Sequence, residues 1–191
     1  MEIVRENYIY KINNIIEDSV CDKILDYYQR ENSNDINGDE LPWFENNTLY
    51  WNVLRDTEIG KDIGLCRDKI INFAEECYNE TLYPNVSTLV MWKEGKDMPI
   101  HKDNGYEDDK EQFHMRKYSA VLYLNDDYDG GETIILKENS DEVEIKNNPK
   151  KGSVIIFRSD ESCLHGVKTV TRGNRLTFGM WFTDDIEYQE A

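Results

Sequence analysis

Apolar residues recur at helical spacing in the first third of the chain. Asp18 offers an N-cap to a segment in which Ile24 and Tyr28 lie on one face of a helix. Apolar residues of 59–79 also recur every three to four residues, or at multiples of that interval. The pattern therefore predicts two helices in the N-terminal part of the chain.

After Pro84 the pattern changes to short runs rich in β-branched and aromatic residues. Turn-forming residues, such as Gly130-Gly131 and Asn147-Asn148-Pro149, separate these runs. Short strands behind a helical front predict a mainly β protein, a β-sandwich or small barrel buttressed by the N-terminal helices. The eight expected strands are 86–92, 98–103, 118–124, 133–136, 143–145, 153–157, 163–170 and 176–183.

A single domain, residues 1–191, is expected to contain both parts. Residues 1–84 would form the helical support and residues 85–185 the β core, because the β part needs the helices to cover one of its sheets. A chain of 191 residues is long enough for one hydrophobic core. With 39% hydrophobic and 12% aromatic residues, the chain is not expected to be disordered.

The chain is strongly acidic, with a formal net charge of -17. An acidic surface repels phosphate backbones and anionic lipid headgroups, which disfavours nucleic acids and membranes as partners. A basic peptide or a small molecule fits this charge better. The alternative interpretation is that the acidity only keeps the protein soluble.

The sequence also predicts a cytoplasmic location. Residues 1–10 alternate charged and apolar side chains without the apolar core of a signal peptide, and no apolar run approaches membrane-spanning length. An even number of cysteines permits disulfides, but no C-x-x-C pair occurs and free thiols in a reducing compartment are expected. The four cysteines are Cys21, Cys66, Cys77 and Cys163.

Two of the three histidines belong to a pattern typical of metal ligands. His101 and Asp103 are two residues apart on an expected strand, so their side chains project from the same face. His165 lies on a late strand that a closed sandwich can bring alongside. Two histidines and one carboxylate form the facial triad of non-haem iron(II) oxygenases. Alternatively, His101 is a polar residue at a strand end, and Asp103 with Asn104 begins a turn.

Arg175 follows His165 by ten residues and is the candidate anion-binding group. If 172–174 is a three-residue hairpin loop, with Gly173 at positive φ, then Thr171 faces Arg175 and the same face continues to His165. The two side chains would then point into one cavity, where the guanidinium can hold a carboxylate of a small diacid. The alternative is a structural salt bridge to one of the 39 acidic residues.

Several segments occur in an order and spacing that match a known family. They are His101-Lys102-Asp103-Asn104, the YSAVLYLNDD run 118–127, Gly130-Gly131-Glu132, the GSVIIF run 152–157, the HGVKTVTRGNR run 165–175 and Trp181-Phe182-Thr183. Together they resemble the 2-oxoglutarate/iron(II) dioxygenases of the prolyl hydroxylase group, whose catalytic domain is a double-stranded β-helix, or jelly roll. The resemblance covers roughly Thr88 to Asp184 and is nearest to the prolyl 3-hydroxylase branch, although prolyl 4-hydroxylases share much of it.

The resemblance implies a function and a role for each matching residue. His101, Asp103 and His165 would bind Fe(2+), and Arg175 would bind the distal carboxylate of 2-oxoglutarate. Tyr123 would add a hydroxyl to that carboxylate; alternatively it is a core aromatic. The implied reaction hydroxylates a substrate with O2 and releases succinate and CO2, with L-ascorbate as reductant. The implied substrate is a peptidyl proline; another protein side chain or a small molecule is the alternative.

The sequence departs from the family pattern at one cosubstrate position and in its targeting signals. Trp92 stands where the family often has a tyrosine that contacts 2-oxoglutarate, which changes the hydrogen bonding expected there. Trp181 would pack beneath the site. Family members in collagen processing carry secretory signals, which are not found here, so collagen is doubtful as a substrate.

Two polar segments also suggest contacts with a substrate. Residues 105–116 are expected to form a loop that can act as a lid, in which His114 contacts substrate or is simply solvated. An aromatic cluster interrupts the polar stretch 31–48 and follows it. This cluster would line a peptide groove or buttress the core, and it consists of Trp43, Phe44, Tyr50 and Trp51.

Two rival functions remain at this stage. An oxygenase of nucleic-acid bases would need a basic, strand-tracking surface, which the charge of -17 and the lack of a second arginine after Arg175 disfavour. A jelly-roll binding module with an inactive or zinc-filled site belongs to a different class of protein. All three candidate metal ligands and Arg175 are present, which argues against a site that has lost its activity.

Overall fold

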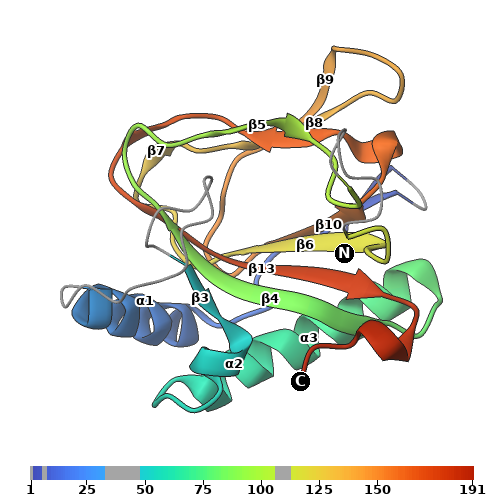
Figure 1. Ribbon diagram of the computed structural model, residues 1–191. Helices are drawn as coiled ribbons and strands as arrows, with labels where there is room; N and C mark the ends of the chain where they lie inside the picture. The colour runs from blue at the N-terminus through green and yellow to red at the C-terminus, as the bar shows by residue number, and fades with distance from the viewer. Residues whose placement is uncertain (1, 6–7, 33–47, 106–112) are drawn as a thin grey trace.

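The computed structural model describes residues 2–5, 8–32, 48–105 and 113–191. Two antiparallel sheets face each other, and helices cover the outer face of the larger one (Figure 1). The larger sheet has seven strands in the order β1 (Glu2–Arg5), β2 (Ile9–Ile12), β10 (Val154–Arg158), β6 (Tyr118–Tyr123), β13 (Arg175–Thr183), β4 (Tyr83–Trp92) and β3 (Thr48–Tyr50).

The smaller sheet and a two-stranded ladder complete the β part. The smaller sheet has the order β5 (Met98–His101), β11 (His165–Val167), β8 (Thr133–Leu136) and β9 (Val143–Asn147). The ladder pairs β12 (Val170–Arg172) with β7 (Asp129–Gly130). The helices are α1 (Asp18–Asn32), α2 (Trp51–Leu54) and α3 (Gly60–Tyr78), with short 3-10 helices at Glu161–Cys163 and Ile186–Tyr188.

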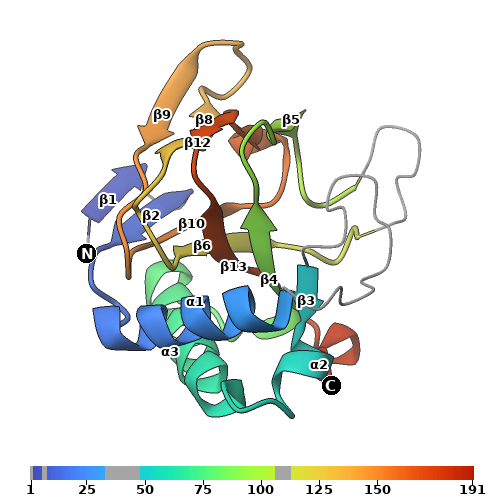
Figure 2. The same cartoon turned by 90° about the vertical axis from the view of Figure 1, so that its left-hand side faces the viewer.

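The larger sheet separates two apolar layers because successive side chains of a strand point to opposite faces. On β13, Leu176, Phe178, Met180 and Phe182 pack with apolar residues of α1 and α3. The alternate residues, which include Arg175, therefore face the smaller sheet. Figure 2 shows the same layering from the side, with α1 and α3 below the larger sheet. The site lies between this face and the smaller sheet.

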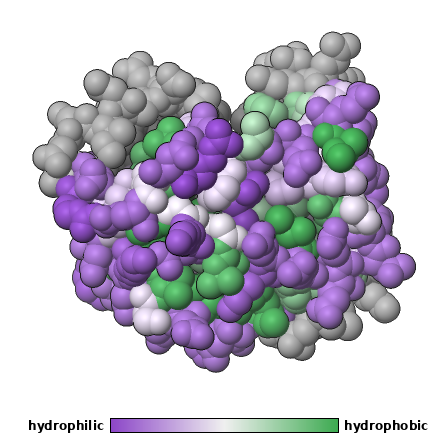
Figure 3. All heavy atoms as spheres, turned by 90° about the horizontal axis from the view of Figure 1, so that it is seen from below, coloured by the Kyte–Doolittle hydropathy of each residue, from purple (hydrophilic) through white to green (hydrophobic). Residues whose placement is uncertain are grey.

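The outer surface of the helical layer is predominantly polar (Figure 3). Among the described residues, large apolar side chains are exposed there at scattered positions, such as Val53 on α2, Leu65 on α3 and Ile186 near the C-terminus. No helix in the described ranges combines the length and apolar content needed to span a bilayer. Cys21, Cys66 and Cys163 are buried and carry free thiols, as expected.

The two expected helices are confirmed as α1 and α3, and seven of the eight expected strands recur with small shifts of their ends. The expectation of a helical front is wrong at β1, β2 and β3, which are strands. The expected strand 163–170 is also wrong. Its first residue belongs to a 3-10 helix, residues 165–167 form β11, and its last residue begins β12, which lies in a different sheet. The strand must leave the smaller sheet here to bring the chain towards β13.

Candidate metal and cosubstrate site

The two histidines of the predicted triad lie on neighbouring strands. His101 ends β5 and His165 begins β11, and the two residues are direct partners in the antiparallel ladder. Their ring centroids are 4.4 Å apart. Asp103 follows β5 and reaches both rings, with 3.4 Å from Oδ1 to Nε2 of His101 and 3.2 Å from Oδ2 to Nε2 of His165. The structure thus brings together one potential ligand atom from each of the three residues, all within 4.8 Å of one another.

Hydrogen bonds from the surrounding chain hold the three side chains in this arrangement. Nδ1 of His101 lies 2.8 Å from the carbonyl oxygen of Pro99, and Nδ1 of His165 lies 3.0 Å from that of Cys163. A carbonyl can only accept, so Nδ1 carries the proton in both rings and Nε2 is left to bind a metal. The hydroxyl of Ser119 donates to Oδ2 of Asp103 at 2.6 Å.

The electrostatics of the cluster favour an ionised carboxylate. Burial by itself raises the pKa of Asp103, but the charges and hydrogen bonds of His165 and His101 outweigh it and hold that pKa well below the usual range. Burial lowers the pKa of His101, but the hydrogen bond and charge of Asp103 outweigh it and raise that pKa. Two imidazole nitrogens and one carboxylate oxygen are a donor set that fits iron(II) with open positions for other ligands.

Gly166 keeps β5 and β11 close enough for this cluster to form. A Cβ at Gly166 would lie 2.7 Å from the carbonyl oxygen of Met98 and 3.1 Å from Cδ1 of Ile100. Both contacts are tighter than a side chain normally tolerates, and the first is with backbone. A larger residue at this position must therefore push β5, which carries His101, away from β11.

We expect Gly166→Ala to weaken the binding of Fe(2+) or Mn(2+) by about tenfold or more, as disturbed support of metal ligands does, and to destabilise the fold by about 1–3 kcal/mol. Isothermal titration with the metal and thermal unfolding measure the two effects. Gly64→Ala is the control: its Cβ lies in α3, 3.8 Å from Trp51, and should stabilise the protein by about 0.4–1 kcal/mol. Unchanged metal affinity in Gly166→Ala would contradict this role.

Arg175 reaches the same inner face by a different route from the one expected. Gly173 has positive φ (78°), as predicted, but 172–174 is not a hairpin loop. It connects β12 of the two-stranded ladder to β13 of the larger sheet, so Thr171 and Arg175 are not ladder partners. Arg175 instead pairs with Trp92 of β4, and strand alternation turns it away from the helices. Arg175 therefore points between the sheets, as predicted, but its pairing with β4 places it there and not a hairpin loop at 172–174.

The guanidinium of Arg175 is buried without a counterion. The residue is 1% exposed, and no carboxylate in the described part of the chain lies within salt-bridge distance of it. Its Nη2 donates to Oγ1 of Thr133 at 3.3 Å, and its Nε has no hydrogen-bond partner among the described residues. A structural salt bridge therefore does not account for Arg175. An uncompensated buried cation is the arrangement expected for binding an anion.

The register of β8 relates this cation to the metal cluster. Ile135 is the ladder partner of His165, and Thr133, which contacts Arg175, is the partner of Val167. Ile135 and Thr133 point to the same face and are two residues apart, roughly 7 Å along the strand. Because partners in a ladder project to the same side, His165 and the guanidinium of Arg175 face the same space between the sheets. A five-carbon diacid can span this separation.

Tyr123 lies beside Arg175, with its ring centroid 5.3 Å from the guanidinium carbon. Its hydroxyl donates to Thr133 at 2.7 Å and accepts from Nδ2 of Asn147 at 2.9 Å. Sequence reasoning missed both partners, which stand on β8 and β9. The hydroxyl of Tyr123 is thus already hydrogen-bonded, and it orients Thr133 towards the guanidinium.

The two tryptophans singled out in the sequence flank the site. Trp92 packs against Arg175, with its ring centroid 5.3 Å from the guanidinium carbon, and its Nε1 donates to Thr177 at 3.3 Å. Trp181 is the ladder partner of Ser119, which binds Asp103. The guanidinium carbon of Arg116 lies 4.6 Å from the Trp181 ring centroid. Trp92 thus adjoins the cation, and Trp181 adjoins the metal cluster.

A pocket of about 450 Å³ includes the residue that follows Asp103 in its lining, but none of the three candidate ligands lines it. Asn104, which follows Asp103, forms one wall, and the C-terminal segment forms another through Tyr188. His114 is exposed, lines the same pocket and makes an edge contact with Tyr188, with ring centroids 5.9 Å apart. The other lining residues are Met115, Arg116, Lys117, Asp160, Thr183, Asp184 and Asp185.

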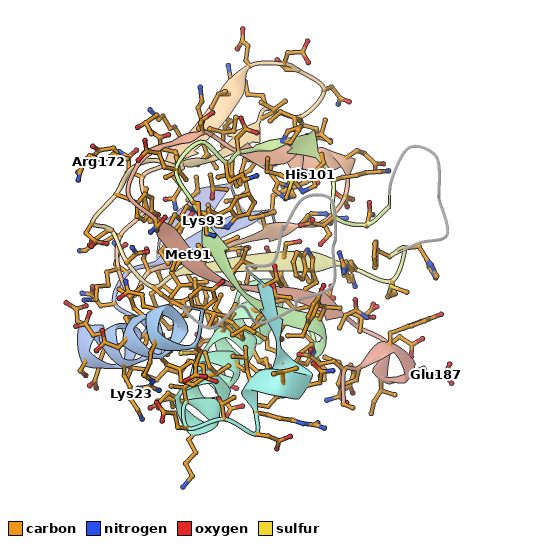
Figure 4. The ribbon with its side chains drawn as sticks, turned by 60° about the vertical axis from the view of Figure 1, so that its left-hand side comes forward. Lys23, Met91, Lys93, His101, Arg172 and Glu187 are labelled. Carbon is orange, nitrogen blue, oxygen red and sulfur yellow. The ribbon has the colours of Figure 1, made fainter. Side chains whose placement is uncertain are left out.

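The remaining sequence expectations near the site are only partly described. Residues 106–112 of the expected lid, together with Trp43 and Phe44, lie outside the described residues. Trp51 packs against the core and lies 4.1 Å from the guanidinium carbon of Arg67, which favours a buttressing role. Figure 4 shows where the site lies, with His101 on the smaller sheet and Met91 and Lys93 at the end of β4.

Fold and site together define a jelly-roll protein with a cluster of two histidines and one aspartate, suited to a metal ion, between its sheets. The family model described as "2OG-Fe(II) oxygenase superfamily" matches residues 86–183, and the chain belongs to this superfamily. Membership implies Fe(2+) as the metal and 2-oxoglutarate as the cosubstrate, in agreement with the donor set.

Relatives that match part of the chain are prolyl 3-hydroxylases. Prolyl 3-hydroxylase 2 of Mus musculus is 42% identical over 100 residues, which are 48% of this chain and 14% of the relative. Prolyl 3-hydroxylase 1 of Homo sapiens is 41% identical over 76 residues, which are 40% of this chain and 10% of the relative. The matching region therefore spans only a small part of these relatives.

Solved structures of prolyl hydroxylases share the fold. A Trichoplax adhaerens prolyl hydroxylase in complex with a hypoxia inducible factor peptide fragment has a TM-score of 0.76 at 18% identity, covering 97% of this chain and 88% of that one. A Pseudomonas putida prolyl-4-hydroxylase has a TM-score of 0.70 at 19% identity, and the match covers 96% of this chain and 95% of that one. These likenesses confirm the expected jelly roll buttressed by helices.

Proposed function

We propose that the protein is an Fe(2+)- and 2-oxoglutarate-dependent dioxygenase that hydroxylates a prolyl residue of a peptide. The observation that carries the proposal is an ionised carboxylate between two imidazoles, together with a buried guanidinium that has no counterion among the described residues and faces the same space between the sheets. The first group suits a divalent metal and the second suits the far end of a diacid. A binding module without chemistry has no need of both.

In this proposal His101, Asp103 and His165 hold the metal, and Arg175 holds the distal carboxylate of 2-oxoglutarate. Tyr123 supports that contact through Thr133. Iron(II) and 2-oxoglutarate supply the oxidising chemistry: O2, 2-oxoglutarate and a C–H bond give succinate, CO2 and a hydroxyl group. The protein's own groups orient the metal and the cosubstrate and exclude water from the buried cation.

The peptide substrate is supported by the names of the relatives and by the pocket. Aromatic and cationic groups meet beside the metal cluster where Arg116 stacks on Trp181, a surface on which a proline ring and a peptide carbonyl fit. The net charge of -17 supports a peptide or small molecule over a nucleic acid. A different side chain or a small molecule is the second candidate substrate.

Free buried thiols support a cytoplasmic setting, and L-ascorbate is the proposed reductant.

The experiment is aerobic incubation with Fe(2+), 2-oxoglutarate, ascorbate and a library of proline-containing peptides. Succinate release and a mass gain of one oxygen atom on the peptide are the two readouts. The same peptides with alanine in place of proline, and the Asp103→Ala variant, are the controls. Succinate with every peptide but oxygen on none points to another substrate. Absence of succinate under all conditions, with metal and 2-oxoglutarate both bound, would overturn the enzyme assignment.

A further inference from the structure

Gly179 lies in the middle of β13, although neither its backbone nor its packing requires a glycine. Its φ is outside the left-handed region, and the pairing with β4 is regular from Arg175 to Trp181. A Cβ at Gly179 would lie 3.5 Å from Oγ1 of Thr88 and 3.7 Å from Cη2 of Trp181, which are ordinary van der Waals distances. Glycine weakens the interior of a strand, and one that no bulge or close contact explains often marks the approach of a ligand.

The space above Gly179 lies between the two sheets. Phe178 and Met180 pack against the helices, so the missing side chain of Gly179 would point to the opposite, inner face of the larger sheet. The ladder partners of Gly179 are Thr88 on β4 and Val121 on β6, the two strands that flank β13 (Figure 1). The inner face therefore has a low point in the centre of the sheet.

This row of the sheet lies between the two ends of the proposed active site. One inner position away on β6 is Tyr123, which adjoins Arg175. One inner position away in the other direction is Ser119, which donates to Asp103. Each step is two residues, roughly 7 Å along the strand. A group in the space above Gly179 is therefore close to both the metal cluster and the cosubstrate.

The inner face is open to solvent at this row and closed beyond it. Arg175 and Thr177 are 1% and 4% exposed. In contrast, Gly179, Trp181 and Val121 are only half-buried. A molecule that comes from solvent thus reaches the space above Gly179 first, whereas the cation that receives the cosubstrate lies deeper.

Thr88 places a hydroxyl without a partner beside this space. The residue is 4% exposed, and its Oγ1 has no hydrogen-bond partner in the described part of the chain. An unsatisfied buried hydroxyl is costly, so native proteins seldom keep one without a reason. Because Oγ1 of Thr88 is the atom nearest to the missing Cβ of Gly179, the hydroxyl adjoins the space above that residue. A ligand in this space would complete its hydrogen bonding.

We propose that Gly179 and Thr88 determine the substrate specificity of the hydroxylase: the ring of the target proline occupies the space above Gly179, against the edge of Trp181, and the hydroxyl of Thr88 donates to the adjoining peptide carbonyl. The inference rests on the proposed function, in which a peptidyl proline is the substrate. The amide that contains the proline nitrogen has a carbonyl but no N–H, so it can only accept a hydrogen bond, and a hydroxyl is a matching donor.

The test uses N-acetyl-L-proline methylamide, which has the ring and both flanking carbonyls, and protein that carries Mn(2+) and 2-oxoglutarate without O2. Faster nuclear relaxation of the ring protons, caused by Mn(2+), reports binding close to the metal. We expect Gly179→Ala to weaken this binding about 10-fold to 200-fold, the effect of one methylene that does not fit an apolar site. Thr88→Val should weaken it about 2-fold to 13-fold, the effect of losing one neutral hydrogen bond.

Both substitutions should leave the ligand-free protein at least as stable as the wild type. Gly179→Ala adds a contact at an ordinary distance and removes the conformational freedom of glycine, so its melting temperature should rise about 1–4 °C. Thr88→Val removes an unsatisfied hydroxyl and keeps the shape of the side chain, so this variant should not melt at a lower temperature. A residue with a merely structural role would not gain stability while it loses the ligand.

Gly64→Ala is the matched control, because its Cβ also has room but lies in α3, on the helical side of the larger sheet. It should bind the proline compound as the wild type does. Unchanged binding in Gly179→Ala overturns the inference, and so does weaker binding of 2-oxoglutarate, which would assign the space to the cosubstrate.

The wild-type protein with metal and cosubstrate bound must also prefer the proline compound to N-acetyl-L-alanine methylamide. Equal binding of the two compounds, or binding of neither, overturns the specificity role of Gly179 and Thr88. The proposed function fails by a different result, namely a wild-type protein that binds no Mn(2+) or no 2-oxoglutarate.

Discussion

Replacing Arg175 with methionine is expected to abolish tight 2-oxoglutarate binding while leaving the protein folded and no less stable. The guanidinium is buried, and no residue in the described ranges gives it a counterion, so the bound carboxylate would supply the missing charge. Removing one member of a buried charge pair costs about 2–5 kcal/mol, which corresponds to an affinity loss of about 30-fold to 4,000-fold. Methionine keeps the apolar stem that packs on Trp92 and removes the uncompensated charge from the ligand-free protein.

Calorimetric titration with 2-oxoglutarate and thermal unfolding of the ligand-free protein measure both effects. Arg172→Met is the control, because Arg172 lies three residues away, is exposed and bonds to Asp129 at 2.6 Å. Its replacement should change neither the free energy of 2-oxoglutarate binding nor the free energy of unfolding of the ligand-free protein by more than about 0.5 kcal/mol. If Arg175→Met unfolds or melts many degrees lower, the guanidinium has a structural role instead.

Replacing Asp103 with alanine is expected to remove high-affinity metal binding without unfolding the chain. Asp103 contacts both imidazoles, so its loss leaves two neutral ligands and no negative charge at the metal. Changes to residues that merely support metal ligands already cost 10-fold to 100-fold in affinity, so the loss of a ligand should exceed about 100-fold. Titration with Fe(2+) under anaerobic conditions, or with Mn(2+), measures the affinity, and circular dichroism checks the fold.

Lys102→Ala provides the comparison for this experiment. Lys102 stands between His101 and Asp103 in the sequence, and its ammonium group lies 3.6 Å from Glu161, away from the cluster. Metal affinity should therefore be unchanged in that variant. Retention of wild-type metal affinity by Asp103→Ala would contradict the assignment of the triad, whatever the result for 2-oxoglutarate.

Local patterns in the sequence were sufficient to place the helices and most strands. Short runs rich in β-branched and aromatic residues, separated by turn residues, located β4, β6 and β13. The H-x-D spacing identified His101 and Asp103 as neighbours in the cluster, but Asp103 lies beyond the end of β5, so the expected strand alternation is not what brings the two together. The strands β1 and β2 have only four residues each, EIVR and IYKI, and were missed because neither shows a clear alternation of apolar and polar residues. Short strands become recognisable only through their partners.

Tertiary structure decided the features that the sequence could not reveal. The turn 172–174 has the residues of a hairpin loop but connects two different sheets, because β12 pairs with β7 and β13 with β4 and β6. Ser119 reaches Asp103, and Thr133 reaches Arg175, through hydrogen bonds between strands that are distant in sequence. No local pattern encodes whether a hydroxyl finds a partner.

The position of β2 has a consequence for how the chain folds during synthesis. Ile9 pairs with Phe157 and Ile12 with Val154, so β2 is synthesised long before the strand that it pairs with. Until β10 leaves the ribosome, β2 has no partner on that side, and pairing between such distant segments is slow. Once formed, β2 covers the edge of β10 that would otherwise recruit other chains. The segment 86–183 alone would leave that edge open, and we expect it to aggregate when expressed without residues 1–85.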